Sequence, residues 1–268
     1  MSEPLLQVSH LAKRFEGIVA TDDLLLNVAE GELHAVIGPN GAGKTTLILQ
    51  LSGQLTPDSG RVVFGGQDIT TMPMYRRSAL GLARSFQITS LFLDLSVLDN
   101  VALAVQAHAG HSFRFWRDAR REPELREPAR ALLVRVGLAD RADEPASLLS
   151  HGEHRQLELA MALSGHPRML LLDEPMAGLG PEESARMVEM LRALKRELTI
   201  LLVEHDMEAV FALADRITVL VYGRAIASGT PGEIRANADV RQAYLGEEDP
   251  PPPSFEGGRE GGGDAKKT

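Results

Sequence analysis

One loop near the start of the chain has the residue types that bind phosphate. The segment from Gly38 to Thr45 follows the pattern G-x-x-x-x-G-K-[ST]. Glycines let backbone N–H groups surround an anion, and a helix that begins after the loop adds a partial positive charge. Lys44 would contact the outer phosphates and the Thr45 hydroxyl would bind Mg²⁺, although a glycine-rich turn can also precede a helix without binding anything. The candidate nucleotide-binding residues of this segment are Gly38, Pro39, Asn40, Gly41, Ala42, Gly43, Lys44, Thr45 and Thr46.

An acidic pair further along the chain could supply a second metal ligand and a base. The apolar run Met169–Leu172 is followed directly by Asp173 and Glu174. If the run is a buried strand, Asp173 lies at the carboxyl edge of a sheet, where a carboxylate can bind Mg²⁺ beside the phosphates. Glu174 would orient or deprotonate an attacking water. Alternatively, the two acids cap a helix that begins near Pro175.

Both sites require strands that end at a common sheet edge, and the hydrophobic pattern predicts such strands. Short apolar runs alternate with helical patterns, which is typical of α/β proteins. We expect strands at Leu5–Leu11, Leu24–Val28, Leu33–Ile37, Arg61–Phe64, Met169–Leu172, Thr199–Val203, Arg216–Val221 and Arg224–Ala227. We expect helices at Lys44–Leu51, Glu182–Leu194 and Met207–Ala214, and turns at Gly17, Pro57–Gly60 and Tyr222–Gly223. The phosphate loop would therefore connect a strand to a helix.

The middle and the end of the chain depart from this alternation. Between Ser96 and Leu163 the apolar spacing is helical, with helices expected at Val97–His108 and Glu124–Val136. We therefore expect a helical subdomain over about residues 88–165, inserted in an α/β domain that covers residues 1–246. Residues 247–268 are rich in proline and glycine and contain almost no apolar side chains. This tail is expected to be disordered, because it cannot bury enough surface to fold.

Composition excludes several classes of protein. The 268 residues include 28 Lys and Arg against 37 Asp and Glu, and the net charge of −9 argues against a nucleic-acid-binding protein. The chain has no cysteine, which excludes disulfides, thiolate zinc sites and iron–sulfur clusters. No apolar run approaches the roughly 20 residues that a transmembrane helix needs, and the first residues lack a signal-peptide pattern. We therefore expect a cytoplasmic protein that other subunits bring to any membrane.

A short segment before the acidic pair resembles the signature of one family. Leu149–Glu153 reads Leu-Ser-His-Gly-Glu. By itself this is a capping box, S-x-x-E, which begins many helices. In a chain with a phosphate loop, it resembles the Leu-Ser-Gly-Gly-Gln signature of the ATP-binding subunits of ABC transporters, with His151 and Glu153 at the third and fifth places. The resemblance extends over nearly all of residues 5–246.

The resemblance implies a fold, cofactors and further binding residues. The implied fold is α/β, a P-loop NTPase core with an antiparallel β subdomain and a helical subdomain. The implied cofactors are ATP and Mg²⁺. Ser150 and Gly152 would contact the γ-phosphate of a nucleotide held by a second subunit. Phe15 stands where the family stacks an aromatic ring on adenine, although it could equally be a half-buried strand residue.

Two further positions acquire roles from the resemblance alone. Gln87 matches a glutamine between the core and the helical subdomain that contacts Mg²⁺ or water, and His205 matches a histidine that contacts the γ-phosphate. The family often has an aspartate that bridges two subunits where this chain has Gly180. The implied catalytic residues are Glu174, His205 and Gln87, and the implied metal ligands are Thr45, Gln87 and Asp173.

Several segments are most similar to the ATPases of branched-chain amino acid importers, including residues 149–163, 171–183, 202–214 and 229–247. This similarity implies an ATP hydrolase that powers uptake of branched-chain or related amino acids. The implied partners are two membrane permease subunits, a second ATP-binding subunit and, indirectly, an extracytoplasmic solute-binding protein. The subunit would lie on the cytoplasmic face of the inner or plasma membrane, with residues 87–97 near the permease. The alternatives are the ATPase of a lipid or lipopolysaccharide exporter and a soluble ABC ATPase of DNA repair or translation.

Overall fold

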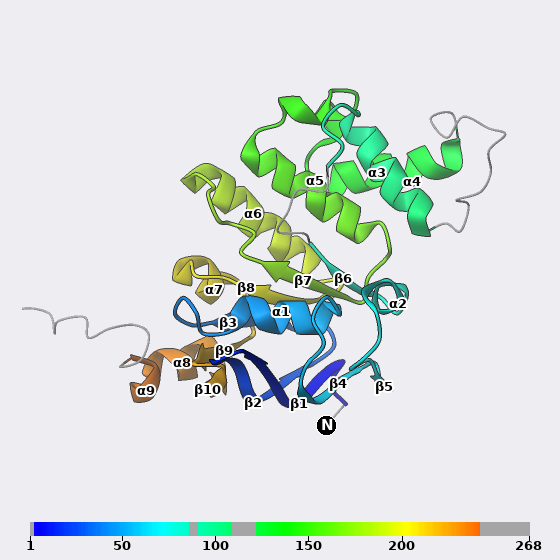
Figure 1. Cartoon of the computed structure of the whole chain (residues 1–268). Helices are drawn as coiled ribbons and strands as arrows, with labels where there is room; N and C mark the ends of the chain where they lie inside the picture. The colour runs from blue at the N-terminus through cyan, green and yellow to red at the C-terminus, as the bar shows by residue number, and fades with distance from the viewer. Residues whose placement is uncertain (1–2, 86–90, 109–121, 242–268) are drawn as a thin grey trace, which may run out of the picture.

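The computed structural model describes residues 3–85, 91–108 and 122–241, which form two sheets and a lobe of helices (Figure 1). The strands are β1 (Leu6–Phe15), β2 (Ile18–Val28), β3 (Leu33–Ile37), β4 (Ser59–Phe64), β5 (Gln67–Asp68), β6 (Leu82–Arg84), β7 (Met169–Asp173), β8 (Thr199–Val203), β9 (Arg216–Val221) and β10 (Arg224–Gly229). The helices are α1 (Lys44–Ser52), α2 (Met74–Ala79), α3 (Val97–His108), α4 (Pro123–Arg135), α5 (His151–Leu163), α6 (Pro181–Leu194), α7 (Met207–Leu213), α8 (Pro231–Ala236) and α9 (Ala238–Val240), with 3₁₀ turns η2 (Ala139–Arg141) and η3 (Ala146–Leu148).

The larger sheet has six strands in the order β10-β9-β3-β8-β7-β6. Neighbouring strands from β9 to β6 are parallel, and only β10 pairs antiparallel, with β9. Every residue of β3, β7 and β8 is buried, as expected for parallel strands covered on both faces. The carboxyl ends of β3, β8 and β7 therefore meet at one edge, as the two chemical motifs require.

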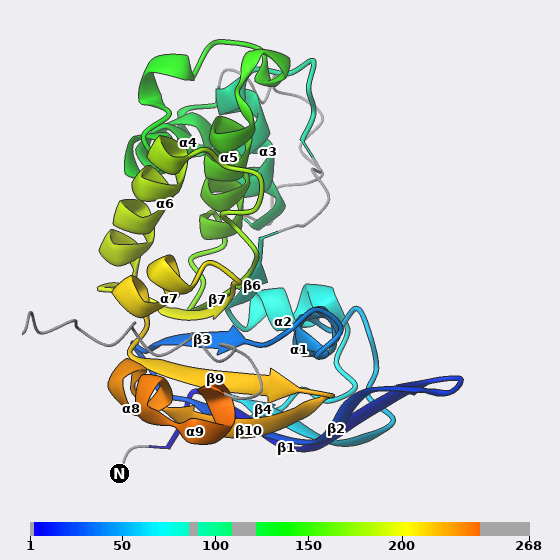
Figure 2. The same ribbon diagram turned by 90° about the vertical axis from the view of Figure 1, so that its left-hand side faces the viewer.

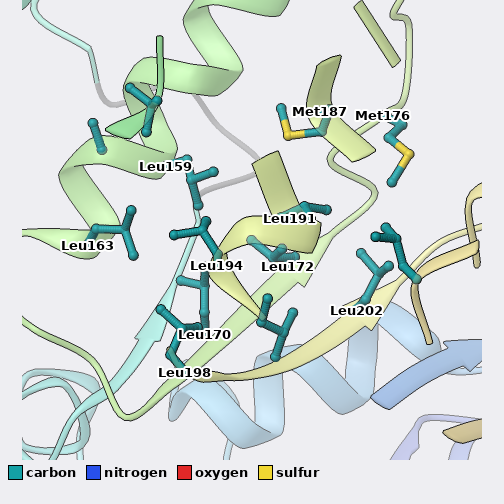
Figure 3. Packing of buried hydrophobic residues seen from close by; sticks show 14 of the residues in the cluster. Leu159, Leu163, Leu170, Leu172, Met176, Met187, Leu191, Leu194, Leu198 and Leu202 are labelled. Carbon is teal, nitrogen blue, oxygen red and sulfur yellow. The ribbon is translucent and has the colours of Figure 1, made fainter. Parts of the chain in front are cut away.

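Side chains of this sheet alternate between two hydrophobic cores. On β7, Leu170 and Leu172 join the core under the helices, whereas Met169 and Leu171 face the other core, beneath α1. On β8, Ile200 and Leu202 likewise belong to the core under the helices, whereas Leu201 and Val203 belong to the core that contains α1. Figure 3 shows the first core between β7, β8, α5 and α6, where the labelled side chains are Leu159, Leu163, Leu170, Leu172, Met176, Met187, Leu191, Leu194, Leu198 and Leu202.

The smaller sheet is antiparallel, in the order β2-β1-β4-β5, and α1 packs between it and the larger sheet (Figures 1 and 2). Leu47, Ile48 and Leu51 of α1 are buried in the core that the two sheets share. This arrangement fixes the helix that follows the phosphate loop on two sides.

Arg77 of α2 binds the carboxyl end of α1. The buried guanidinium donates to the carbonyl oxygens of Gln50 at 2.7 Å, Leu51 at 2.8 Å, Met72 at 2.7 Å and Thr70 at 3.0 Å. Burial lowers the pKa of Arg77 to about 10, so it remains charged near neutral pH. A cation at the last carbonyls of a helix complements the helix dipole.

Helices α3, α4 and α5 pack together as a separate lobe above the larger sheet (Figures 1 and 2). The predicted helix Val97–His108 is confirmed, and the helix predicted at Glu124–Val136 runs from Pro123 to Arg135. Within the described ranges, none of the helices combines the length and the apolar character that crossing a bilayer requires.

The predicted α/β class, with an antiparallel sheet and a helical lobe, is confirmed, but several element boundaries were wrong. Strands β1 and β2 continue through polar residues to the turn at Gly17, because their hairpin pairing extends almost to that turn. The turn predicted at Pro57–Gly60 is shorter, since Ser59 and Gly60 belong to β4, where Ser59 pairs with Ala12 of β1. Gln87 and residues 247–268 lie outside the described residues.

Candidate active site

The predicted phosphate loop connects β3 to α1 and is packed closely against neighbouring backbone. Gly38 and Gly43 have φ angles of +153° and +101°. A Cβ atom would lie 2.1 Å from the Leu220 carbonyl oxygen at Gly38, and 2.0 Å from the Ala20 carbonyl oxygen at Gly43. Both the conformation and the space therefore demand glycine, and the loop path is fixed by β2 and β9.

Lys44 is held inside this loop. Its Nζ donates to the carbonyl oxygens of Gly38 at 2.7 Å and Pro39 at 3.0 Å. Burial lowers the pKa of Lys44, while the negative charges of Glu174 and Asp173 raise it. The cation thus lies in the field of the acidic pair. The other predicted loop residues vary in exposure: Ala42 is buried, Pro39, Gly43 and Thr46 are half-buried, and Asn40, Gly41 and Thr45 are exposed.

The acidic pair and His205 meet where β7 and β8 end. Asp173 is the last residue of β7 and pairs with Val203, the last residue of β8. Glu174 follows with a φ angle of +50°, and its N–H donates to the Val203 carbonyl oxygen at 2.9 Å. His205 Nδ1 lies 4.0 Å from Glu174 Oε1, with the two side chains 58% and 34% exposed. A carboxylate and an imidazole thus reach solvent together at this edge.

Asp173 is buried against Arg84, a residue that the sequence patterns did not single out. Arg84 Nη2 lies 3.3 Å from Asp173 Oδ2, and its Nη1 donates to Gln54 Oε1 at 2.6 Å. Burial raises the pKa of Asp173, and the charge of Arg84 opposes that effect. The only available signal was a basic residue at the end of an apolar run, Leu82-Ala83-Arg84, before the segment of Gln87.

This geometry fits Mg²⁺ held mainly through a nucleotide. Asp173 Oδ1 is buried and has no hydrogen-bond partner among the residues described, so one carboxylate oxygen remains for a cation or its water. The described part of the chain contains no cluster of three histidines or carboxylates that could hold a metal alone. Mg²⁺ is usually held by one or two protein ligands plus phosphate oxygens, which suits Asp173 and Thr45, an exposed residue with a hydroxyl group.

Glu204 is a second residue that the sequence patterns did not single out. It lies directly after β8, and it is completely buried. Its Oε1 accepts from Met176 N at 2.9 Å, and its Oε2 accepts from His205 N at 2.8 Å and Asp206 N at 3.3 Å. The available signal was a charged residue joined without a break to a fully apolar strand, at Val203-Glu204.

The segment that resembles a family signature begins α5. The predicted capping box is confirmed: Ser150 Oγ accepts from Glu153 N at 3.2 Å, and Ser150 N donates to Glu153 Oε2 at 2.7 Å. Glu183 of α6 also covers this helix start. Ser150 Oγ donates to Glu183 Oε1 at 3.2 Å, and a Cβ on Gly152 would lie 2.6 Å from the same oxygen.

The loop between β7 and α6 lies against the same helix start. Glu183 Oε2 accepts from Gly180 N at 3.2 Å, and the Ala177 carbonyl oxygen lies 3.3 Å from His151 Nε2. The loop that lacks the aspartate at Gly180 thus contacts the segment Leu149–Glu153 through the Ala177 carbonyl oxygen. An open pocket of about 420 Å³ lies beside Ser150, Gly152 and Glu183.

The predicted residues do not all meet within one chain. The phosphate loop, the acidic pair and His205 share the sheet edge, whereas α5 lies in the helical lobe, apart from α1 (Figures 1 and 2). Phe15 is 45% exposed at the end of β1, where it pairs with Ile18, two residues before the Ala20 that touches the phosphate loop. The Nζ of Lys13 lies 5.7 Å from the centroid of its ring, so the exposed ring already has one cation as a neighbour.

Comparison with known families gives two matches. The family described as "ABC transporter" matches residues 21–177, and the family described as "Branched-chain amino acid ATP-binding cassette transporter" matches residues 226–250. The first match covers the phosphate loop, the signature segment and the acidic pair. The second begins within β10 and ends at residue 250.

Curated proteins of similar sequence are transport ATP-binding proteins. The chain is 39% identical over 254 residues to the high-affinity branched-chain amino acid transport ATP-binding protein BraF of Pseudomonas aeruginosa, a match that covers 92% of this chain and 100% of the relative. It is 39% identical over 259 residues to LivG of Escherichia coli, which bears the same description, with the same coverage.

Solved structures of similar fold are ATP-binding cassettes. A cassette from an ABC transporter in its ADP conformation is 29% identical and superposes with a TM-score of 0.81, covering 92% of this chain and 100% of that chain. A nucleotide-free cassette is 28% identical, with a TM-score of 0.80 and coverage of 91% and 100%.

Proposed function

Because the chain belongs to the ABC transporter family of ATP-binding subunits, we propose that it hydrolyses ATP to power uptake of branched-chain or related amino acids through membrane permeases. The observation that carries the ATPase proposal is the shared sheet edge, where the phosphate loop, Asp173, Glu174 and His205 converge. The proposal of an amino acid cargo rests on the named relatives and on the family match at residues 226–250.

Nucleotide binding is assigned to the phosphate loop. Lys44 and the loop N–H groups would hold the phosphates, and Phe15 would stack on the adenine. Thr45, Asp173 and Gln87 would hold Mg²⁺, which when bound neutralises phosphate charge and orients the terminal phosphate. Lys44 can serve in this role because its present partners are loop carbonyls, which a phosphate can replace as acceptors.

Hydrolysis is assigned to the residues at the ends of β7 and β8. Glu174 would accept a proton from a water as the water oxygen bonds to the γ-phosphorus, while the bond from that phosphorus to the ADP oxygen breaks. His205, 4.0 Å from the Glu174 carboxylate, would orient the γ-phosphate. Gln87 would help to place the water or the metal.

The remaining site residues are assigned to the interface with a second ATP-binding subunit. Ser150 and Gly152 lie at the start of α5, where a helix N-terminus and a hydroxyl favour an anion. Since α5 lies in the helical lobe, apart from the helix α1 that follows the chain's own phosphate loop, its start would serve the nucleotide of a partner subunit (Figures 1 and 2). Two chains would then enclose two nucleotides head to tail.

The proposed function also assigns a role to each part of the chain. We assign residues 1–246 to the ATP-binding domain, about 88–165 to its helical subdomain, and 247–268 to a tail without a role in catalysis. The permease would dock beside the helical lobe, where Phe92 and Leu93 are exposed. The subunit would be peripheral, on the cytoplasmic face of the membrane, and its partners would include two permease subunits and an extracytoplasmic solute-binding protein.

The test is a pull-down from native membranes with the full chain carrying Glu174→Gln, in Mg²⁺ and ATP, read by mass spectrometry. The matched control is Glu182→Gln, an exposed acid at the start of α6. Recovery of two permease subunits, a second ATP-binding subunit and a solute-binding protein, with the Glu174 variant above the control, supports the proposal. Lipid-export components would assign the chain to an exporter, and recovery of DNA-repair or ribosomal factors alone would refute transport.

A further inference from the structure

Glu204 is a buried carboxylate that forms no ion pair with any lysine or arginine of the described residues. The side chain is 0% exposed, and among the described residues the only basic group within 4 Å of it is His205 Nδ1, 3.5 Å from Oε2. Burying a carboxylate is costly unless hydrogen bonds replace its water. Here three backbone N–H groups do so, which indicates a group fixed in one orientation.

The three donors come from two different loops. Met176 N belongs to the loop after β7, two residues beyond Glu174. His205 N and Asp206 N belong to the loop after β8. One carboxylate oxygen therefore holds each loop, and the Glu204 side chain is a short bridge between the segments that present Glu174 and His205.

Such a bridge matters because the neighbouring backbone is in an unfavourable conformation. Glu174 has a φ angle of +50°, which a residue with a side chain adopts only when its surroundings impose it. The contact of its N–H with the Val203 carbonyl oxygen fixes one side of Glu174, and the Glu204 contact at Met176 fixes the other. Asp206 is also fixed downstream, since its side chain accepts from Ala209 N at 3.1 Å.

From this geometry, and on the basis of the ATPase function proposed above, we propose that Glu204 is a positioning residue that sets His205 and Glu174 at their mutual distance by bridging their loops. A carboxylate suits the task because both oxygens only accept. Glutamine has one oxygen and one NH₂ group. In one of the two loops, a backbone N–H would therefore point at the NH₂ group, and two donors cannot form a hydrogen bond. Aspartate keeps the charge but is one methylene shorter and cannot span both loops.

The test compares steady-state ATP hydrolysis by the full chain with Glu204→Gln and Glu204→Asp. We expect kcat to fall about 10- to 100-fold, the size of effect that a small misplacement of catalytic groups produces. The KM for ATP should stay within about twofold, because the phosphate loop is untouched. Glu32→Gln is the matched control: Glu32 is also buried and accepts from Ala29 N and His34 Nδ1, but at the amino end of β3. Its kcat should remain at the wild-type value.

A double-mutant cycle with His205→Ala separates positioning from general damage, with single-turnover hydrolysis to resolve slow rates. If Glu204 acts through His205, Glu204→Gln in the His205→Ala background lowers the rate by less than it does alone. Independent effects that multiply, or a wild-type kcat for both Glu204 variants, would overturn the inference. Wild-type hydrolysis by His205→Ala would instead refute the proposed role of His205. It would also refute the inference that Glu204 acts by positioning His205.

Discussion

Replacing Arg77 by methionine tests how α2 holds α1, the helix that follows the phosphate loop. Methionine fills much of the same space but removes all four hydrogen bonds to carbonyl oxygens. Two of these four hydrogen bonds are buried, those to the carbonyl oxygens of Gln50 and Leu51 at the end of α1. The variant removes the guanidinium donor from both, but the Gln50 carbonyl oxygen keeps the Gly53 N–H at 3.3 Å, whereas the Leu51 carbonyl oxygen has no other donor among the described residues.

The expected loss of stability follows from those two carbonyls. A buried acceptor left without a partner, as at Leu51, costs about 1–3 kcal/mol, and loss of a hydrogen bond from a charged donor, as at Gln50, costs about 1.5–3 kcal/mol, so the two losses together cost about 2.5–6 kcal/mol. Part of this is offset, because a guanidinium charge is no longer buried. We expect a net loss of about 3 kcal/mol in the free energy of unfolding, which lowers the Tm by roughly 6–12 °C for a domain of this size.

The assay is urea and thermal unfolding of the full chain, followed by circular dichroism. Arg76→Met is the matched control, because Arg76 is the exposed neighbour of Arg77 on the same helix and should change stability by less than about 0.5 kcal/mol. The Kd for ATP of the folded variant should stay at the wild-type value, since Arg77 contacts the end of α1 opposite the phosphate loop. A loss below about 1 kcal/mol for Arg77→Met would refute the reasoning.

Four further substitutions have defined outcomes. Gly43→Ala should abolish ATP binding measured by calorimetry, because its Cβ would lie 2.0 Å from a backbone oxygen; binding at wild-type affinity would contradict the loop geometry. Glu174→Gln should bind ATP but lose at least about 100-fold in hydrolysis; near-normal turnover would remove Glu174 as the base. Arg84→Met should raise the Mg²⁺ concentration needed for half-maximal ATP binding about 10-fold or more, since Arg84 holds Asp173 Oδ2; an unchanged requirement would assign Arg84 to stability alone. Glu183→Gln, in the Glu174→Gln background, should lower the ATP concentration needed for dimer formation in size-exclusion chromatography, because an amide keeps the helix cap but not the negative charge; no change would show that the carboxylate does not compete with phosphate.

The sequence was most informative where one local pattern determines the structure. The strands Leu33–Ile37 and Thr199–Val203 have the predicted boundaries, because buried parallel strands are continuously apolar and end at a chemical motif. The phosphate loop and the capping box at Ser150 were also predicted, since each depends on residues at a fixed short spacing.

The contacts that the sequence did not predict join segments far apart in the chain. Arg84 reaches Asp173 only because β6 pairs with β7, and Glu204 reaches Met176 only because β8 pairs with β7. The polar ends of β1 and β2 were missed for a related reason. Their pairing in the antiparallel sheet, rather than an apolar pattern, extends them.

The Glu183 carboxylate at the start of α5 has a consequence for which anions the signature segment can bind. A tethered group a few ångströms from Ser150 and Gly152 acts at an effective concentration in the millimolar range or above, so dilute free phosphate cannot displace it. A nucleotide presented on the surface of a second subunit is equally concentrated once the two surfaces touch. If the segment binds the nucleotide of a second subunit, as proposed, it would bind an anion that the second subunit presents but would not bind free phosphate at low concentration.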